Sequence, residues 1–401
     1  MADTRDTMRL SLAAAEAGRA ELSSWPWREG NDFSLLADSD RIFRRMLAAI
    51  EAAREAVLLE MYLVESGMVA RRFIDALAGC AARGVRVHVL FDDFGSWSLA
   101  DADRRRLLDA GAHLNFFNPL TARKRFANLL RDHRKLLVID GDIAFVGGVG
   151  LADEFIDGRR GRRAWRDLMV EIRGPVVGDW HSAFAHNWRR SGGRPDVAAA
   201  SSAPPAPAGD GAGALGRVAL SEADHRSVLA NDVVRRIDGA RRRAWIMSAY
   251  FVPSRRFRKA LRRAARRGVD VRLLVPGRKT DHPWVRHAAR RFYGKLLRNG
   301  VRIFEYQPRV LHGKMTVCDD WVSIGSSNLD RWSFRWNLEA NQEIDSPAFA
   351  GLAAGIFESD CGESEELDRH RWRRRAALDR LRESIAGALD RVLDRWRPRG
   401  H

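Results

Sequence analysis

The sequence predicts an α/β protein made of two similar domains that are related by a pseudo-twofold axis. A His-x-Lys-x4-Asp pattern occurs twice, at residues 133–140 and 312–319. A similar alternation of strand-like and helix-like segments precedes each copy, as is typical of α/β domains. Between the copies lies a segment rich in Ala, Pro, Gly and Ser, residues 191–215, whose composition is that of a flexible linker or surface loop.

The chain has 401 residues, which is enough for two domains of ordinary size. We expect an amino-terminal lead at 1–30, a first domain at 31–190, the linker at 191–215 and a second domain at 216–401. An active site that uses both motifs would then lie at the interface of the two domains, near the pseudo-twofold axis.

The elements of the first half follow from its apolar runs. Residues 56–64 predict a strand, and a helix is expected over 71–83 because Gly84 is a natural helix end. Further strands are expected at 85–91 and 113–117, with a helix between them. The strand that carries the first motif comes next.

The second half repeats this order. A strand is expected at 244–252, a helix at 255–267 that ends at Gly268, and strands at 269–275 and 301–306. The strand with the second motif follows.

The motif residues suit the chemistry of a phosphodiester. A His and a Lys two positions apart on a strand point to the same face. His133 with Lys135, and His312 with Lys314, would therefore place two imidazoles and two ammonium groups around one site. Such a site offers a nucleophile, a proton donor and cations for the phosphoryl oxygens.

A turn of small residues follows each motif, and we expect both turns to bind phosphoryl oxygens. The turns read Gly147-Gly148-Val149-Gly150 and Gly325-Ser326-Ser327-Asn328. Backbone N–H groups, a hydroxyl and an amide would serve as donors.

The motif carboxylates Asp140 and Asp319 lie where a strand ends and a turn begins. Asp is common at such positions because its side chain caps the turn, so we expect both residues to be structural. Five residues separate Asp319 from Gly325, against six between Asp140 and Gly147, so the second hairpin should be one residue shorter.

Two such motifs in matching surroundings resemble the phospholipase D superfamily. The sequence is most similar to bacterial cardiolipin synthases, in particular to the shorter ones that lack amino-terminal membrane helices. The segments that carry this resemblance, within residues 30–345, are 131–141, 249–253, 311–314, 325–330 and 337–341. The chain departs from the family at Gly150, where Asn is usual.

The resemblance implies a mechanism. One His attacks phosphorus and forms a phosphohistidine, while the other gives a proton to the leaving alkoxide and then takes one from the acceptor alcohol. It favours His133 as nucleophile and His312 as acid and base, although the sequence leaves the order open. Family members hold each imidazole through Nδ1 with a downstream carboxylate. Alignment of the halves assigns that role to Asp167 and Glu339, each for the His of its own motif.

The resemblance requires no metal or cofactor, and the sequence shows no carboxylate cluster that indicates a metal. Arg131 is expected to join the phosphate-binding groups. The basic and apolar segment 123–131 is expected to receive a lipid head group, and the alternative is a solvated basic loop.

The formal net charge of +17 indicates an anionic partner, although Arg-rich chains also arise from genomic base composition. Three sparse Cys residues favour a reducing compartment, and residues 1–30 contain no apolar stretch of signal-peptide length. We therefore expect peripheral binding to the cytoplasmic face of the cell membrane. Segment 372–396 has apolar residues at helical spacing, and would either lie on a bilayer or pack on the second domain. Trp25, Trp27 and Trp97 are candidate interfacial anchors.

Three functions fit these observations. The leading one is transfer of a phosphatidyl group between two phosphatidylglycerol molecules, which makes cardiolipin. The second is hydrolysis, by a phospholipase D or by a phosphodiesterase that acts on nucleic acid, which is the less favoured partner. The third is binding of anionic lipid without catalysis.

Overall fold

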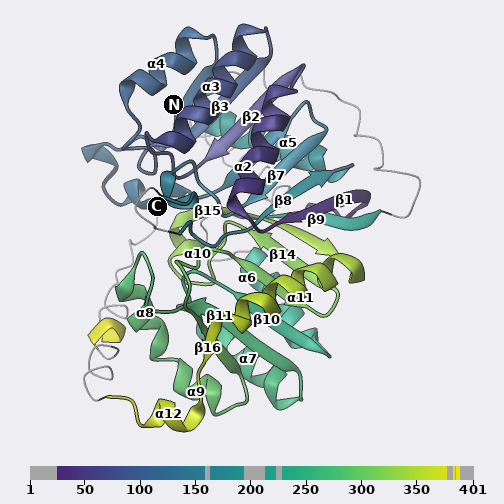
Figure 1. Ribbon diagram of the computed structural model, residues 1–401, viewed down its shortest axis with the longest axis vertical. Helices are drawn as coiled ribbons and strands as arrows, with labels where there is room; N and C mark the ends of the chain where they lie inside the picture. Colours follow the sequence, from purple (N-terminus) through teal and green to yellow (C-terminus); the bar gives the residue numbers. More distant parts are fainter. Residues whose placement is uncertain are drawn as a thin grey trace, which may run out of the picture.

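The computed structural model describes residues 25–158, 163–193, 213–222, 228–376, 383 and 385–388. In this part of the chain, 16 strands form one continuous sheet that runs through both halves of the molecule, with helices packed on its faces (Figure 1). The expected α/β fold with two similar halves is confirmed.

The first half begins with β1 (Arg28–Leu36), α2 (Ser39–Glu51), β2 (Ala56–Met61), α3 (Met68–Ala82), β3 (Arg86–Asp92), α4 (Asp101–Asp109) and β4 (His113–Phe117). It continues with the 3-10 helix η1 (Ala122–Leu129), β5 (Arg131–Asp132), β6 (Lys135–Ile139), β7 (Ile143–Gly147), the 3-10 helix η2 (Asp153–Phe155), β8 (Met169–Arg173) and α5 (Val176–Arg190).

The second half begins with β9 (Ala214–Glu222), α6 (Val228–Gly239), β10 (Arg243–Met247), α7 (Arg255–Arg266), β11 (Asp270–Pro276), α8 (Pro283–Arg290) and α9 (Tyr293–Leu297). It continues with β12 (Arg302–Tyr306), β13 (Met315–Cys318), β14 (Trp321–Gly325), α10 (Ser333–Trp336), β15 (Asn337–Asp345), α11 (Pro347–Gly362), β16 (Ser364–Glu366) and α12 (Arg369–Arg373).

The strand order shows the repeat directly. The first half runs β4-β3-β2-β6-β7-β8-β1, and the second runs β12-β11-β10-β13-β14-β15-β9 with β16 added at its edge. β1 and β9 pair antiparallel at the centre and join the two halves. β1 begins three residues before the expected start of the first domain at 31. β9 begins two residues before the expected start of the second domain at 216.

The expected helix ends are confirmed, because Gly84 and Gly268 both have a φ of +88°. The strand expected at 244–252 is shorter and ends at Met247. Beyond it, the Ser248 hydroxyl donates to the carbonyl of Tyr250 and accepts from the N–H of Leu329, so the chain leaves the sheet as a fixed loop.

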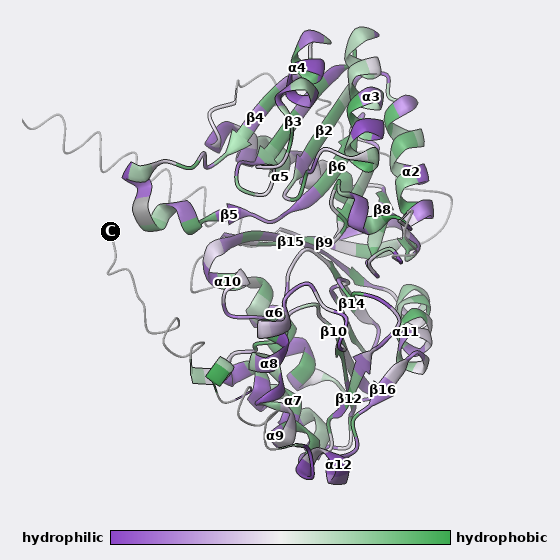
Figure 2. Cartoon of the chain, turned by 60° about the vertical axis from the view of Figure 1, so that its left-hand side comes forward, coloured by the Kyte–Doolittle hydropathy of each residue, from purple (hydrophilic) through white to green (hydrophobic). Residues whose placement is uncertain are grey.

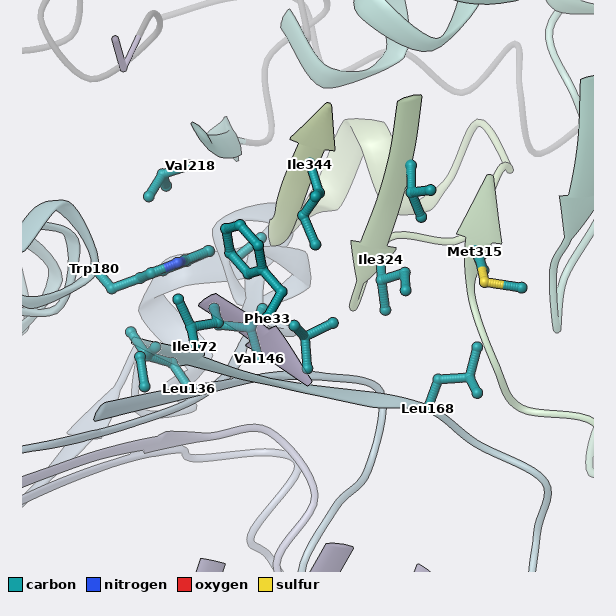
Figure 3. Packing of buried hydrophobic residues seen from close by; sticks show 14 of the residues in the cluster. Phe33, Leu136, Val146, Leu168, Ile172, Trp180, Val218, Met315, Ile324 and Ile344 are labelled. Atoms are coloured by element: carbon teal, nitrogen blue, oxygen red, sulfur yellow. The ribbon is translucent and has the colours of Figure 1, made fainter. Parts of the chain in front are cut away.

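One apolar core is shared by the two halves. Phe33, Trp180 and Ile344 meet there with residues from both sets of strands (Figure 3). The Trp180 indole also donates a hydrogen bond of 2.7 Å to Gln342 Oε1, which links α5 to β15. Two further apolar clusters lie one in each half. The helices carry both hydrophobic and hydrophilic residues along their length (Figure 2).

Two sequence predictions fall largely outside the described residues. Residues 194–212 of the expected linker 191–215 lie outside the described residues. The carboxy-terminal segment 372–396 is described only at 372–376, 383 and 385–388. Among the described residues, no helix is long and apolar enough to cross a membrane.

The motif carboxylates cap the loops that precede β2 and β10. Asp140 accepts the backbone N–H groups of residues 54, 55 and 56 at 2.8–2.9 Å, and Asp319 accepts those of residues 241, 242 and 243 at 2.9–3.0 Å. Both have a φ of +53°. The second hairpin is shorter at this turn, because Cys318 pairs with Trp321 whereas Ile139 pairs with Ile143. This geometry supports a structural role for both carboxylates.

We therefore predict that Asp140→Ala and Asp319→Ala each lower the free energy of unfolding by about 1–3 kcal/mol, because three backbone donors lose their acceptor. Asp142→Ala is the control, since Asp142 is in the same turn but mainly exposed, and it should change stability by less than about 0.5 kcal/mol. Urea denaturation measures both effects. Equal stability of the Asp140 and Asp142 variants would contradict the capping role.

Candidate active site

The backbone around each motif His is paired with a segment from the opposite half. β5, which precedes His133, pairs with the start of β15, and the N–H of His133 donates to the carbonyl of Leu338 at 3.0 Å. In the same way, the N–H of His312 donates to the carbonyl of Arg166 at 2.7 Å. Each His was expected on the motif strand, but it lies two or three residues before β6 or β13, where the other half of the molecule holds its backbone.

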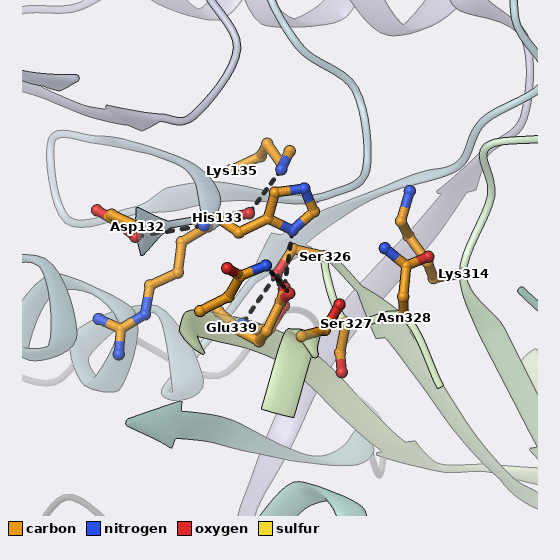
Figure 4. A network of polar contacts seen from close by, with 12 residues as sticks. Asp132, His133, Lys135, Lys314, Ser326, Ser327, Asn328 and Glu339 are labelled. Carbon is orange, nitrogen blue, oxygen red and sulfur yellow. Dashed lines mark hydrogen bonds and ion pairs between the residues drawn. The ribbon is translucent and has the colours of Figure 1, made fainter. Parts of the chain in front are cut away.

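The carboxylates cross over between the halves. His133 Nδ1 lies 3.0 Å from Glu339 Oε2, and His312 Nδ1 lies 2.5 Å from Asp167 Oδ2 (the first pair is drawn in Figure 4). The expected choice of Asp167 and Glu339 as the partners of the imidazoles is confirmed. The expectation that each serves the His of its own motif is wrong, because the strand pairing described above brings each His to the carboxylate of the other half.

The small residues of the turns support these carboxylates. Ser326 Oγ donates to Glu339 Oε2 at 2.5 Å, so its proton is committed there and not to a phosphate. A side chain at Gly148 would place its Cβ 2.2 Å from Asp167 Oδ1, and one at Gly147 would meet the carbonyl of Leu168 at 2.3 Å. The two glycines thus make room for the segment that carries Asp167 and leads into β8.

Both carboxylates stay ionised although they are buried. Burial alone would raise the pKa of Glu339, but His133, Lys135 and the Ser326 hydroxyl outweigh it and lower the pKa below its usual value. Burial likewise opposes ionisation of Asp167, and His312 with Lys314 lowers its pKa. A negatively charged carboxylate beside Nδ1 holds the imidazole proton on Nδ1. It therefore favours the tautomer whose Nε2 carries the lone pair.

The two motif lysines lie beside their histidines. Lys135 Nζ donates to the carbonyl of His133 at 2.6 Å and stands 5.0 Å from the centre of the Tyr62 ring. Lys314 Nζ lies 2.9 Å from Nδ1 and 3.1 Å from Nε2 of His312. Both ammonium groups are almost completely buried.

Burial lowers the pKa of the two histidines and the two lysines of the motifs. The pKa of His133 falls to about 4 despite the opposing charge of Glu339, and that of Lys135 falls to about 7. Burial also lowers the pKa of His312 and of Lys314. A bound phosphate anion favours the protonated forms of these groups, so its binding should raise their pKa values and draw protons into the site.

Both imidazoles open into one cavity of about 400 Å³. Besides His133 and His312, its lining residues are Tyr62, Leu63, Glu65, Lys135, Gly148, Gly150, Glu154, Phe155, Trp165, Tyr250, Asp281, His282, Asn328, Ser333 and Asn337. The expected position of the site at the interface of the halves is therefore confirmed. Asn328 is seated in it, with Oδ1 accepting from the N–H of Tyr250 at 3.3 Å, so the shorter hairpin does not displace this side chain.

Arg131 does not reach this cavity. Its guanidinium lies 3.3 Å from Asp92 Oδ1 and donates to the carbonyl of Asn118 at 2.9 Å, and the side chain is buried. The expectation that Arg131 binds phosphate is wrong, because its donors hold the loops after β3 and β4.

Sequence reasoning missed two tyrosines of the cavity wall. Tyr62 and Tyr250 occupy matching positions of the sequence repeat, one residue after the end of β2 and three residues after the end of β10. The Tyr62 ring contacts the His133 ring at 4.8 Å between centroids. The signal was present, since both strands continue into Tyr followed by an apolar pair. Among the described residues, no group of three or more His, Cys, Asp or Glu side chains is placed to hold a metal ion.

Comparisons with known proteins show the family and the fold of the chain. The family model described as "Cardiolipin synthase, PLD-like domain" matches residues 46–188 and 233–361. Cardiolipin synthase A of Pseudomonas aeruginosa is 35% identical over 374 residues, which cover 92% of this chain and 74% of that protein. Cardiolipin synthase B of Salmonella typhimurium is 35% identical over 364 residues, which cover 86% of each. The structure of phosphatidylserine synthase from Haemophilus influenzae has the same fold, with a TM-score of 0.69 at 13% identity over 94% of this chain and 97% of that one.

The crossed pairing predicts which His responds to which carboxylate. Glu339→Gln should lower the pKa of His133, because the carboxylate that opposes the effect of burial is lost. Asp167→Asn should lower the pKa of His312 for the same reason. Histidine titration by NMR, with assignments from His133→Gln and His312→Gln, measures both. A response of His312 to Glu339→Gln, with His133 unchanged, would contradict the crossed arrangement.

Proposed function

The chain belongs to the cardiolipin synthase family of the phospholipase D superfamily, and we propose that it joins two phosphatidylglycerol molecules into cardiolipin and releases glycerol. It is a phosphatidyltransferase of that superfamily. The observation that carries the proposal is the pair of buried imidazoles, His133 and His312, which share one cavity and are each fixed through Nδ1 by a carboxylate.

The first half reaction breaks the bond between phosphorus and the head-group glycerol. Nε2 of neutral His133 attacks phosphorus, and Glu339 stabilises the positive charge that develops on the imidazole. The bound phosphate raises the pKa of His312, so this group is protonated and gives its Nε2 proton to the leaving glycerol oxygen. Lys135 and Lys314 neutralise the phosphoryl oxygens, and the Asn328 amide offers N–H donors to them.

The second half reaction reverses these roles. A glycerol hydroxyl of a second phosphatidylglycerol attacks phosphorus, its proton passes to His312, and the bond between phosphorus and His133 breaks. The pKa of His133, which burial lowers to about 4, supports its role as nucleophile, because the neutral imidazole keeps the Nε2 lone pair that attacks phosphorus.

Either His133→Ala or His312→Ala should lower the rate of cardiolipin formation by at least 10²–10⁴-fold, because each His is needed in both half reactions. The assay is lipid analysis after incubation with phosphatidylglycerol vesicles. Cardiolipin and glycerol in equal amounts are expected. Phosphatidic acid as the main product would favour the hydrolase instead, and turnover by either variant near the wild-type rate would contradict the two-histidine site.

We also propose that the protein binds anionic bilayers peripherally, through exposed apolar side chains around the cavity. These side chains form what we call the rim patch, which consists of Met68, Phe94, Trp97, Phe126, Leu129 and Trp284. All of them lie on segments that follow the carboxyl ends of β2, β3, β4 and β11, the same edge of the sheet that bears the cavity.

The rim patch is continuous with the cavity wall. The N–H of Val64, next to the lining residue Leu63, donates to the carbonyl of Gly95, which lies between Phe94 and Trp97 in the chain. Across the cavity, Trp284 follows the lining residue His282 by two positions. A bilayer that contacts these side chains would place lipid head groups at the catalytic cavity.

Two of the three candidate Trp anchors need correction. Trp25 and Trp27 pack on the core clusters, and the Trp27 ring is covered by Arg217 at 4.9 Å. In the basic segment 123–131, Lys124 Nζ donates to Asn118 Oδ1 at 3.0 Å, while Arg123 is exposed. Of the three candidate Trp anchors, Trp97 alone is largely exposed, at 72%.

The double variant Phe94→Ser/Trp97→Ser should bind phosphatidylglycerol vesicles about tenfold or more weakly, since each large apolar side chain contributes roughly 1.5–3 kcal/mol when it is buried. Leu352→Ser is the matched control, because Leu352 is 61% exposed on α11, away from the rim patch. Vesicle sedimentation measures binding. If the control variant loses as much binding as the double variant, the rim patch is not the contact surface.

A further inference from the structure

One wall of the catalytic cavity offers hydrogen-bond acceptors and negative charge, in a site that otherwise attracts anions. Tyr250 and Asp281 form this wall, and both line the cavity with the two motif histidines. The Tyr250 hydroxyl donates its proton to Asp281 Oδ2. Burial, together with the charge of Asp281, raises the pKa of Tyr250, so the phenol keeps this proton.

The wall is held in place by its own contacts. Asp281 Oδ1 accepts the N–H of His282 at 3.0 Å and lies 3.3 Å from the Thr280 hydroxyl. The Tyr250 ring contacts the His282 ring at 5.3 Å, and its backbone N–H donates to Asn328. The pair is thereby tied to the turn that follows the second motif.

The chemistry of this wall excludes phosphate and suits hydroxyl groups. Because the single proton of Tyr250 is committed to Asp281, the phenol oxygen and the carboxylate can only accept hydrogen bonds from a ligand. A phosphate oxygen, which is an acceptor and negatively charged, would be repelled. The hydroxyl of an alcohol is a donor and would be bound.

The wall is on the His312 side of the cavity. The negative charge of Asp281 acts to raise the pKa of both His312 and Lys314, against the effect of burial. The equivalent tyrosine of the first half, Tyr62, packs instead on the His133 ring and below the Lys135 ammonium. The two halves of the site have therefore diverged, with a carboxylate beside the tyrosine of the second half.

We infer that Tyr250 and Asp281 form a glycerol subsite that binds the hydroxyl next to the reacting oxygen of the alcohol. The inference rests on the proposed function, in which His312 exchanges a proton with that reacting oxygen. The two half reactions present the same group to His312, since the leaving alcohol and the acceptor are both glycerol units. One subsite can therefore serve both steps.

In the transfer step, the reacting glycerol oxygen forms its bond to phosphorus while the bond between phosphorus and His133 Nε2 breaks. The proton of that oxygen passes to His312 Nε2. The neighbouring hydroxyl keeps its proton and donates a hydrogen bond to the wall. Water and monohydroxy alcohols have no second hydroxyl to bind there, so the subsite favours transfer to glycerol over hydrolysis.

A competition assay tests this inference. The donor is a short-chain soluble phosphatidylglycerol, and the acceptors, present together, are deuterated glycerol, 1-propanol and water. Mass spectrometry then separates deuterated phosphatidylglycerol, phosphatidylpropanol and phosphatidic acid. The ratio of the first two products reports preference for the second hydroxyl and does not depend on the fraction of folded protein.

Asp281→Ala should lower the ratio of glycerol product to propanol product by about tenfold, because a charged hydrogen-bond acceptor for the second hydroxyl is lost. Tyr250→Phe should lower it as well. The matched controls are Glu363→Ala and Tyr306→Phe, since the Tyr306 hydroxyl and Glu363 form a similar pair 3.2 Å apart outside the cavity. Both controls should keep the wild-type ratio.

The outcomes separate this inference from the function on which it rests. If the wild-type protein forms products and the Asp281 and Tyr250 variants keep its ratio, the subsite is wrong and the phosphatidyltransferase is unaffected. An equal loss of all three products also overturns the subsite, because a purely structural role does not alter the ratio. If the wild-type protein forms neither deuterated phosphatidylglycerol nor phosphatidylpropanol, the proposed function fails and the inference fails with it.

Discussion

Two hydrogen bonds that cross between the halves hold the site together, from His133 to Glu339 and from His312 to Asp167. Each joins an imidazole from one half to a carboxylate that is almost completely buried in the other. Neither half alone could orient its own His. Loss of one partner would leave a buried polar group unsatisfied, which typically costs about 1–3 kcal/mol and more for a charged group, so catalysis and the joining of the halves depend on the same contacts.

The rest of the architecture keeps these partners in register. The central β1–β9 pairing makes the two repeats one sheet, and the shared core with its hydrogen bond from Trp180 to Gln342 resists sliding of one half past the other. A site with two histidines needs this rigidity, because a shift of about 1 Å can cost a factor of ~100 in rate. The interface between the repeats is thus a packed core and not a flexible hinge.

The fold class and most residues of the candidate site could be predicted from the sequence, because the repeat, the motifs and the two downstream carboxylates are visible as patterns. The His partner of each carboxylate could not be predicted. Alignment of Asp167 with Glu339 shows that the two carboxylates are equivalent, but it does not show which His each one contacts. That choice is made by strand pairing between halves. The ion pair of Arg131 with Asp92 and the commitment of Ser326 to Glu339 depend likewise on residues far apart in the sequence. Asp281 was missed because it lies in a loop with no repeated pattern.

The pseudo-twofold symmetry extends to the crossed pairs but not to the cavity walls, where Tyr62 and Tyr250 have different neighbours. We propose that this difference assigns different roles to the two histidines, and the central claim that follows is that each chain has one composite site with one nucleophile. Intact-mass spectrometry of the protein, denatured rapidly during turnover of a short-chain phosphatidylglycerol, tests this claim most directly. The account predicts a mass gain of one phosphatidyl group per chain, carried by the peptide that contains His133. A gain of two groups, with one on each motif, would contradict it.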